Sequence, residues 1–308
     1  PRWITPAVNT LANDVMGRIN QAAAVSGMSL CAMCLLSAKK HAMAQDELER
    51  AIDDYLGLLK AAPYSELSSI PELDGKALVE STLKLNKLEV SQDSFGTIIS
   101  LKRKNAVALT YYRNNILHLF ALPGLVSAIV FAHKGLAKQH VIALVGQLYP
   151  LLQRELFIYM SHEEAMDYTD RLLSTMIDMG LLRAEGDTVC PPAATSKAFW
   201  LLNRSIQETL QRYAAVLTIL KKEQTISRGR LEKQSREFAE RLAALHGINS
   251  PEFFDKNVLS TFIHALKDNE LINASSEGQL EHSDTSEALL ASVEELISPE
   301  ITQRLQQI

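Results

Sequence analysis

The most constraining feature of the sequence is a long stretch without a formal charge, which runs between Arg113 and Lys134. Few protein surfaces leave so many apolar side chains in water, so the stretch is either a central helix wrapped by protein or a segment that meets a bilayer. Asn114, Asn115 and His118 favour the buried helix. Pro123 lacks an amide proton and clashes with the preceding turn, so we expect the helix to kink or restart there.

A second uncharged run lies between Arg18 and Lys39, inside a helical pattern that we expect from residue 5 to residue 38. Polar residues and many alanines within this run favour a buried helix over a membrane span. Cys31 and Cys34 have the spacing of a redox pair or half a zinc site, but no second pair completes such a site. We therefore interpret both cysteines as packing residues.

The order of the remaining elements predicts a repeated unit. An amphipathic helix over residues 45–61, a second helix over 75–84 and a hairpin over 88–101 follow one another. A similar order returns over residues 138–190 and, more faintly, over 195–281, where the first long helix is expected over residues 195–220. The predicted fold is mainly α with small β-hairpins, a multi-helical chain of winged-helix-like units linked by a long apolar helix over residues 110–133. We divide it into residues 1–108, 109–194 and 195–308.

Composition excludes several classes of protein. The 31 basic and 36 acidic residues give a net charge of -5, which argues against a general nucleic-acid binder held by phosphate contacts. Three cysteines are too few for a disulfide framework and fit a reducing compartment. The first residue is Pro1 and not Met, so we expect a fragment of a longer polypeptide or a processed chain.

The best candidate for a binding function by residue type is the group Tyr112, Arg113, Asn114 and Asn115. The planar guanidinium of Arg113 suits a phosphate or a carboxylate, and the two amides suit a helix cap or a contact with another domain. A purely structural role for the same residues stays open. The group is therefore predicted as an interdomain or phosphate contact.

A basic cluster follows near residue 230, formed by Arg228, Arg230, Lys233 and Arg236. Such a cluster could touch DNA or anionic headgroups, but interleaved glutamates favour a solvated helix face. We find no nucleophile elbow, glycine-rich phosphate loop or clustered metal ligands in the sequence. No catalytic residue, cofactor or metal is predicted for this chain.

Four stretches carry a resemblance to a known family. They are residues 19–26 (INQAAAVS), 110–116 (TYYRNNI), 208–214 (ETLQRYA) and 245–256 (LHGINSPEFFDK). Together they resemble the C-terminal region of bacterial membrane-bound glycerol-3-phosphate 1-O-acyltransferases, over nearly the whole chain. They do not include the catalytic centre of that family.

The resemblance implies an enzyme that transfers an acyl group from acyl carrier protein or acyl-coenzyme A to sn-glycerol 3-phosphate in phospholipid synthesis. It implies an upstream catalytic domain in the same polypeptide, a membrane surface as partner, no nucleic acid, and a location on the cytoplasmic side of the inner membrane. This chain alone is then expected to be inactive.

His41 and Asp46 are separated by four residues, as are the catalytic histidine and aspartate that the resemblance implies. The phosphate-binding segment that accompanies such a pair is missing downstream, so we interpret the spacing as coincidence. A different class of function also stays open. The helix, helix and hairpin order would suit a winged-helix binding or scaffold protein, either a transcription regulator or a subunit of a complex.

Overall fold

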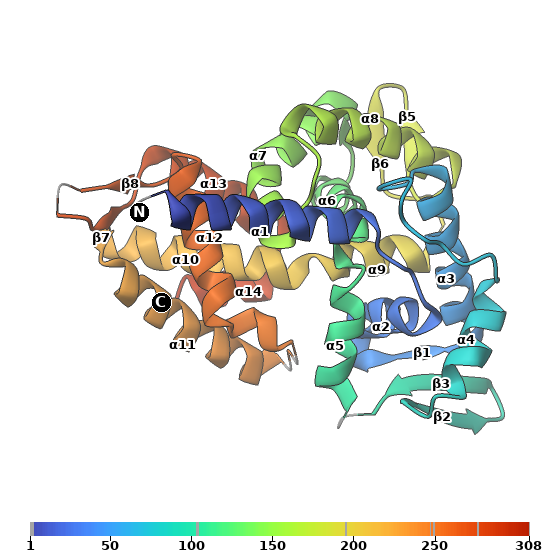
Figure 1. Ribbon diagram of the computed structural model, residues 1–308. Helices are drawn as coiled ribbons and strands as arrows, with labels where there is room; N and C mark the ends of the chain where they lie inside the picture. The colour runs from blue at the N-terminus through green and yellow to red at the C-terminus, as the bar shows by residue number, and fades with distance from the viewer. Residues whose placement is uncertain are drawn as a thin grey trace. The chain divides into compact units, whose positions relative to one another are not determined.

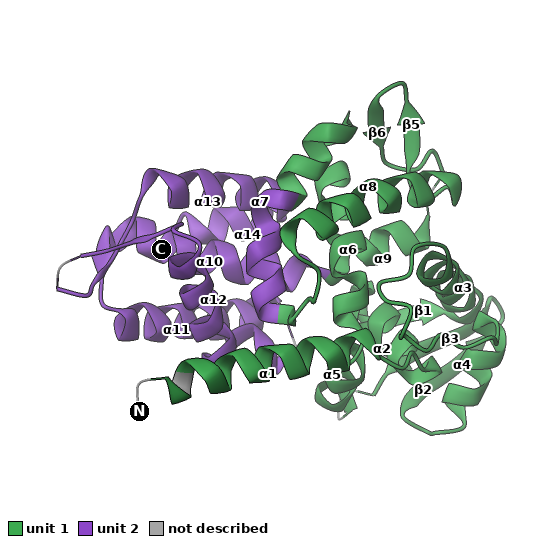
Figure 2. Cartoon of the chain, turned by 45° about the horizontal axis from the view of Figure 1, so that its top comes forward, with its two compact units in different colours: residues 1–145, 156–205 green, residues 146–155, 206–308 purple. Residues whose placement is uncertain are grey.

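The computed structural model describes residues 3–102, 105–194, 196–246, 248, 250–275 and 277–307. This described part of the chain is mainly helical and contains three small antiparallel sheets of three strands each (Figure 1). It divides into two compact units. Unit 1 contains residues 1–145 and 156–205, and unit 2 contains residues 146–155 and 206–308 (Figure 2). The division into residues 1–108, 109–194 and 195–308 stays a prediction.

Unit 1 begins with two helices in place of the single helical region expected over residues 5–38. They are α1 (Ile4–Gln21) and α2 (Gly27–Ser37), and an extended segment separates them. Ser26 ends this segment, because its hydroxyl accepts from the Ser29 amide in a capping box that starts α2. Ten of the eleven residues of α2 are buried, which confirms the buried helix.

The first sheet of unit 1 frames a pair of helices. The elements follow in the order β1 (Ala42–Ala44), α3 (Gln45–Ala61), α4 (Gly75–Leu83), β2 (Leu88–Asp93) and β3 (Gly96–Leu101). The strands lie in the order β1-β3-β2, with Val90 opposite Ile99 and Met43 also paired with Ile99. Leu48, Ile52 and Tyr55 of α3 are buried at helical spacing, as the amphipathic pattern predicts.

The same order returns twice. In the second instance β4 (Leu136–Ala137), α7 (Lys138–Leu156), α8 (His162–Asp178), β5 (Arg183–Glu185) and β6 (Thr188–Cys190) give the strand order β4-β6-β5. In the third, within unit 2, β7 (Thr225–Ile226), α11 (Arg228–His246), the 3-10 helix η3 (Pro251–Phe254), α12 (Lys256–Asp268), β8 (Asn273–Ala274) and β9 (Leu280–Glu281) give β7-β9-β8.

The remaining helices complete each core. Unit 1 adds α5 (Ala106–Asn114), α6 (Leu117–His133) and α9 (Lys197–Ser205), and α6 packs along α9 at the centre of that unit (Figure 1). Unit 2 adds α10 (Gln207–Glu223), α13 (Asp284–Leu296) and α14 (Pro299–Leu305), and α10 packs against α13 and α11. Stacked rings of Tyr213 and Phe262, with centroids 4.1 Å apart, join α10 to α12.

The predicted apolar helix over residues 110–133 is not continuous, and it does not restart at Pro123. α5 and α6 are bent by 88° where Asn115 and Ile116 join them, and α6 continues through Pro123. Ile116 leaves helical geometry at a φ of -126°, while Pro123 costs α6 only one main-chain hydrogen bond. The Ser127 hydroxyl donates to the Pro123 carbonyl at 2.8 Å in the following turn.

Burial confirms that the apolar stretch is a core helix of unit 1. The thirteen residues from His118 to Val130 are all buried. Among the described residues no single helix combines the length and apolar character needed to cross a bilayer. α5 and α6 meet that requirement only as a bent pair.

Candidate functional site

The predicted group at residues 112–115 lies at the end of α5, where the structure brings together only two of its members. Nε and Nη2 of Arg113 both donate to Oδ1 of Asn114 at 3.2 Å, and Arg113 is only 6% exposed. Tyr112 and Asn115 lie at the surface. A buried guanidinium with an amide beside it suits a fixed polar contact, and the role of the four residues stays a prediction.

A second polar group lies at the first turn of α6, and the sequence did not indicate it. Nε2 of His118 donates to the backbone carbonyl of Asn20 at 2.9 Å, near the end of α1. The side-chain amide of Asn20 donates to the carbonyl oxygens of Leu156 at 2.7 Å and Phe157 at 3.3 Å. These bonds fasten the end of α1 to α6 and to the end of α7 with the residue that follows it.

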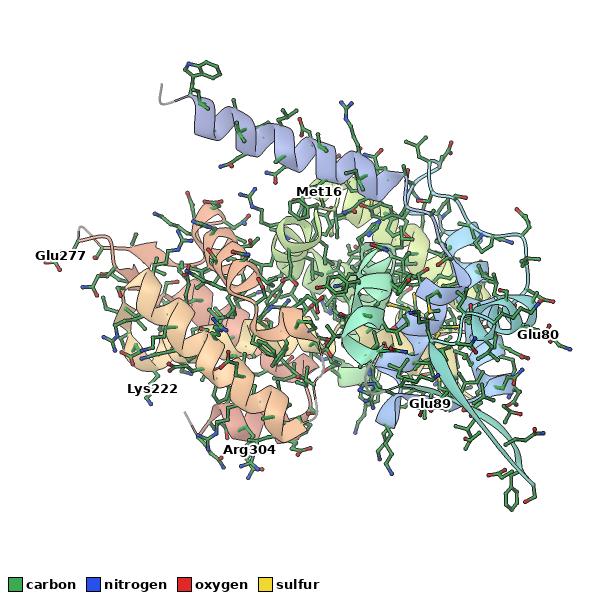
Figure 3. The ribbon with its side chains drawn as sticks, turned by 60° about the horizontal axis from the view of Figure 1, so that its bottom comes forward. Met16, Glu80, Glu89, Lys222, Glu277 and Arg304 are labelled. Atoms are coloured by element: carbon green, nitrogen blue, oxygen red, sulfur yellow. The ribbon has the colours of Figure 1, made fainter. Side chains whose placement is uncertain are left out.

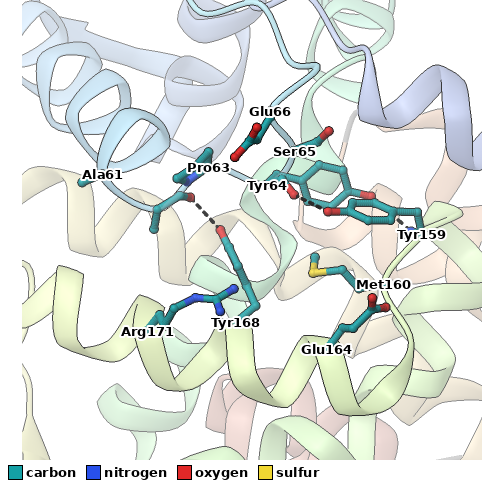
Figure 4. Close-up of a pocket in the computed structure, with 11 residues that line it drawn as sticks. Ala61, Pro63, Tyr64, Ser65, Glu66, Tyr159, Met160, Glu164, Tyr168 and Arg171 are labelled. Carbon is teal, nitrogen blue, oxygen red and sulfur yellow. Dashed lines mark hydrogen bonds between the residues drawn. The ribbon is translucent and has the colours of Figure 1, made fainter.

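Tyrosines extend this group toward α8. The ring of Tyr64 lies edge-on to His118, with centroids 5.1 Å apart, and edge-on to Tyr159, with centroids 5.2 Å apart. The Tyr159 hydroxyl donates to the Tyr64 carbonyl at 2.9 Å, and the Tyr168 hydroxyl donates to the Ala62 carbonyl at 2.9 Å (Figure 4). We call Tyr64, His118, Tyr159 and Tyr168, together with the adjoining Asn20, the aromatic cluster.

A pocket of about 410 Å³ opens beside the aromatic cluster, within unit 1 (Figure 4). Residues 61–66 form one wall, and Tyr159, Met160 and Tyr168 form the other. Arg171 and Glu164 of α8 also line it, so its walls carry both signs of charge. Because the lining carries both positive and negative side chains, it does not indicate one chemical class of ligand.

The titration of the aromatic cluster favours a structural role. Burial lowers the pKa of His118 to about 4, although the hydrogen bond to Asn20 opposes this shift. Burial also raises the pKa of Tyr64 and of Tyr168 above the usual value. At neutral pH the imidazole is therefore uncharged and both phenols keep their protons. The cluster holds main-chain carbonyls in place and presents no charged acid or base.

His41 and Asp46 do not form a catalytic pair. Nδ1 of His41 lies 3.3 Å from the Leu35 carbonyl, while the carboxylate of Asp46 pairs with Arg50 at 2.5 Å on the surface of α3. Asp46 lies in the first turn of α3, where an acidic residue favours the helix dipole. These separate contacts support the interpretation of the spacing as coincidence.

The two other motifs have structural partners. Cys31 and Cys34 are free thiols inside α2, and burial raises the pKa of Cys31 to about 12 and that of Cys34 well above its usual value. The basic cluster of α11 is paired with glutamates along the helix and its neighbourhood, as a solvated face requires. The pairs are Arg228 with Glu232, Arg230 with Glu223, Lys233 with Glu237 and Arg236 with Glu240.

No group of three or more histidine, cysteine or acidic side chains that could hold a metal occurs among the described residues. Sequence reasoning missed the aromatic cluster because Tyr64 and Tyr159 are 95 residues apart and follow no common motif. One signal was present. Asn20 belongs to a stretch quoted for the resemblance, and His118 comes two residues after another.

The described elements form a mainly helical region built around three small antiparallel sheets. The chain belongs to the family described as glycerol-3-phosphate acyltransferase C-terminal region, because the model of that family matches residues 1–275 of 308. This match confirms the resemblance of the four sequence stretches.

The names of curated relatives agree with this family match. Glycerol-3-phosphate acyltransferase of Pseudoalteromonas atlantica is 94% identical over 311 residues, and that of Alteromonas mediterranea is 52% identical over 311 residues; each match covers 100% of this chain. That of Aeromonas hydrophila subsp. hydrophila is 46% identical over 87% of this chain and 33% of the relative. The chain spans 38% of the length of the first two relatives. These comparisons give no support to a winged-helix regulator.

Proposed function

We propose that this chain is the non-catalytic C-terminal part of a glycerol-3-phosphate 1-O-acyltransferase. The full polypeptide transfers an acyl group from acyl carrier protein or acyl-coenzyme A to sn-glycerol 3-phosphate and thereby supplies phospholipid synthesis. The observation that carries the proposal is the family match over residues 1–275, together with relatives that bear this name and are more than twice as long.

The contacts of two described histidines support the assignment of catalysis to another part of the polypeptide. Acyl transfer to a hydroxyl needs a base within hydrogen-bond reach of the acceptor proton. His41 contacts a backbone carbonyl, and His118 is buried and donates to another, so neither is placed for that task. In this proposal the base and the substrates belong to an upstream catalytic domain.

In this proposal, the three segments with the order strand, helix, helix and hairpin are winged-helix-like scaffolds. The support is their common strand order, in which the last strand always lies between the other two. Short sheets of this kind fix helix pairs while leaving one hairpin exposed. Phe95 at the tip of the first hairpin is 99% exposed, which suits a contact with another part of the polypeptide.

Two finer assignments belong to the same proposal. Tyr112, Arg113, Asn114 and Asn115 form the contact with the catalytic domain or with a phosphate group, and the exposure of Tyr112 and Asn115 at the surface supports this role. The full protein lies on the cytoplasmic side of the inner membrane. That location rests on the resemblance to membrane-bound bacterial enzymes.

The direct test compares this chain with the same chain extended upstream by its natural sequence. Transfer of a labelled acyl group from acyl-coenzyme A to glycerol 3-phosphate is measured for both. Activity only in the extended form is the expected result. Activity in the isolated chain would refute the non-catalytic assignment, and inactivity of a folded extended form toward both acyl donors would refute the enzyme assignment.

A further inference from the structure

The helix α1 carries an unusual distribution of side chains. Apolar residues at three-to-four spacing form one continuous stripe along it, and each is between 43% and 64% exposed. We call this the α1 stripe. It consists of Ile4, Val8, Leu11, Val15 and Ile19. Figure 3 shows α1 with its side chains, with Met16 labelled beside the stripe.

Near its end, α1 contacts the rest of unit 1 through the side opposite the stripe. Gly17 is buried there, and a side chain at this position would begin 3.7 Å from Cβ of Tyr159. Asn20 binds the carbonyls of Leu156 and Phe157 through its side-chain amide. A surface helix normally turns its apolar face to the core. In the last turns of α1 a small residue and a polar residue instead face unit 1, and the stripe stays exposed along the helix.

The charge of α1 helps to identify what covers the stripe. Its 18 residues contain one acidic and one basic side chain, Asp14 and Arg18, and no lysine. Helices that lie on anionic bilayers usually carry several lysines or arginines on the polar face. A continuous apolar stripe on a helix without net charge instead suits an apolar protein surface.

The place of α1 in the family identifies that surface. α1 is the first helix of the region that the family model matches, and more than half of the length of the first two relatives lies outside this region. The family describes a C-terminal region, so most of the additional sequence precedes α1. We propose that the α1 stripe docks onto an apolar surface of that preceding part of the polypeptide.

In this arrangement α1 joins the two parts through its two faces. Asn20 and Gly17 fix it to unit 1, and the stripe packs against the upstream part. The inference rests on the proposed function, because it needs the longer polypeptide. It adds a defined surface and a defined occupant, which acyltransferase activity alone does not require.

The experiment places a cysteine on each side of α1 and measures its reaction with a maleimide. Leu11→Cys tests the stripe, and Thr10→Cys is the matched control, because it is also exposed but points to the other side of the helix. Each substitution is made in the isolated chain and in the full-length polypeptide, in the same detergent. Mass spectrometry of the peptide that contains α1 separates this label from other cysteines.

We expect Leu11→Cys to react at least about tenfold more slowly in the full-length protein than in the isolated chain, while Thr10→Cys changes less than about twofold. Equal rates for Leu11→Cys in the two proteins would overturn the proposal. Slow labelling of Leu11→Cys in the isolated chain would also overturn it, because the chain would then cover its own stripe.

Two further arms examine other occupants. Vesicles of phosphatidylethanolamine and phosphatidylglycerol are added to the isolated chain, and the chain is also diluted over a wide range. Protection of Leu11→Cys by the vesicles would assign the stripe to lipid, and protection at high protein concentration would assign it to a second copy. Either result would replace the proposed occupant.

Acyl transfer by the full-length variants is measured in the same samples. An active full-length protein with an unprotected Leu11→Cys would refute the docking and leave the proposed function intact. A folded full-length protein without activity in the unsubstituted form would refute the proposed function, whatever the labelling result.

Discussion

Replacement of Arg212 by leucine should destabilise unit 2 more than any surface substitution on that unit. Arg212 lies on α10 and forms an ion pair with Glu155, which is near the end of α7. Their side chains are only 3% and 10% exposed, so water does little to screen the pair. The substitution Arg212→Leu keeps an apolar side chain at the site but leaves the Glu155 carboxylate buried without its cation.

The expected cost follows from that lost partner. Removing one member of a buried ion pair typically costs about 3 to 5 kcal/mol, because the remaining charge stays in a poorly solvated site. Removing one member of an exposed pair costs at most about 1 kcal/mol. Arg236→Leu, which removes the exposed partner of Glu240 on α11, is therefore the matched control.

The assay is urea unfolding followed by circular dichroism, combined with hydrogen exchange at the amides of α10 to assign the loss to unit 2. A second variant, Arg212→Leu with Glu155→Leu, removes both charges and should recover most of the lost stability. A cost for Arg212→Leu below about 1 kcal/mol would refute the reasoning. A double variant less stable than the single one would refute it as well.

Three further predictions concern unit 1. Because the pKa of His118 is lowered in the folded state, the unfolded state binds more protons between about pH 4 and pH 6.5, and about 2 to 3 kcal/mol of stability should be lost on acidification from pH 7.5 to pH 4.5. Urea unfolding at the two pH values measures this loss, and His118→Asn should reduce it. An equal loss of stability in the variant and the unsubstituted chain would contradict the prediction. Asn20→Ala removes two bonds to backbone carbonyls and should speed hydrogen exchange at the end of α1, whereas unchanged exchange would argue against that anchor. The buried thiols of Cys31 and Cys34 should react with a maleimide only in denaturant, and rapid reaction in native buffer would show that α2 opens.

Local sequence signals identified most helices of the fold. The spacing of Leu48, Ile52 and Tyr55 predicted α3, which the structure confirms. The hairpins followed from short β-prone runs separated by turn residues. These signals act between neighbours in the sequence, so a single chain displays them.

Features that depend on distant residues were not predictable in the same way. The strands β1, β4 and β7 contain two or three residues each and exist because a later hairpin pairs with them. The break between α5 and α6 lies at the buried residue Ile116, while α6 continues through Pro123, where the sequence carries the more obvious signal. The aromatic cluster likewise depends on contacts across about a hundred residues, such as that between Asn20 and His118.

The path of α7 has a consequence for how the two units can be separated. The chain leaves unit 1 after residue 145, contributes residues 146–155 to unit 2, and returns to unit 1 before it enters unit 2 again at residue 206. A single cut therefore cannot release unit 2 with all of its parts. A fragment that starts at residue 206 would keep Arg212 and lose Glu155, so its core would contain an arginine without its carboxylate. In the language of chain topology, the two units are interleaved, and each depends on the other for a covalently complete fold.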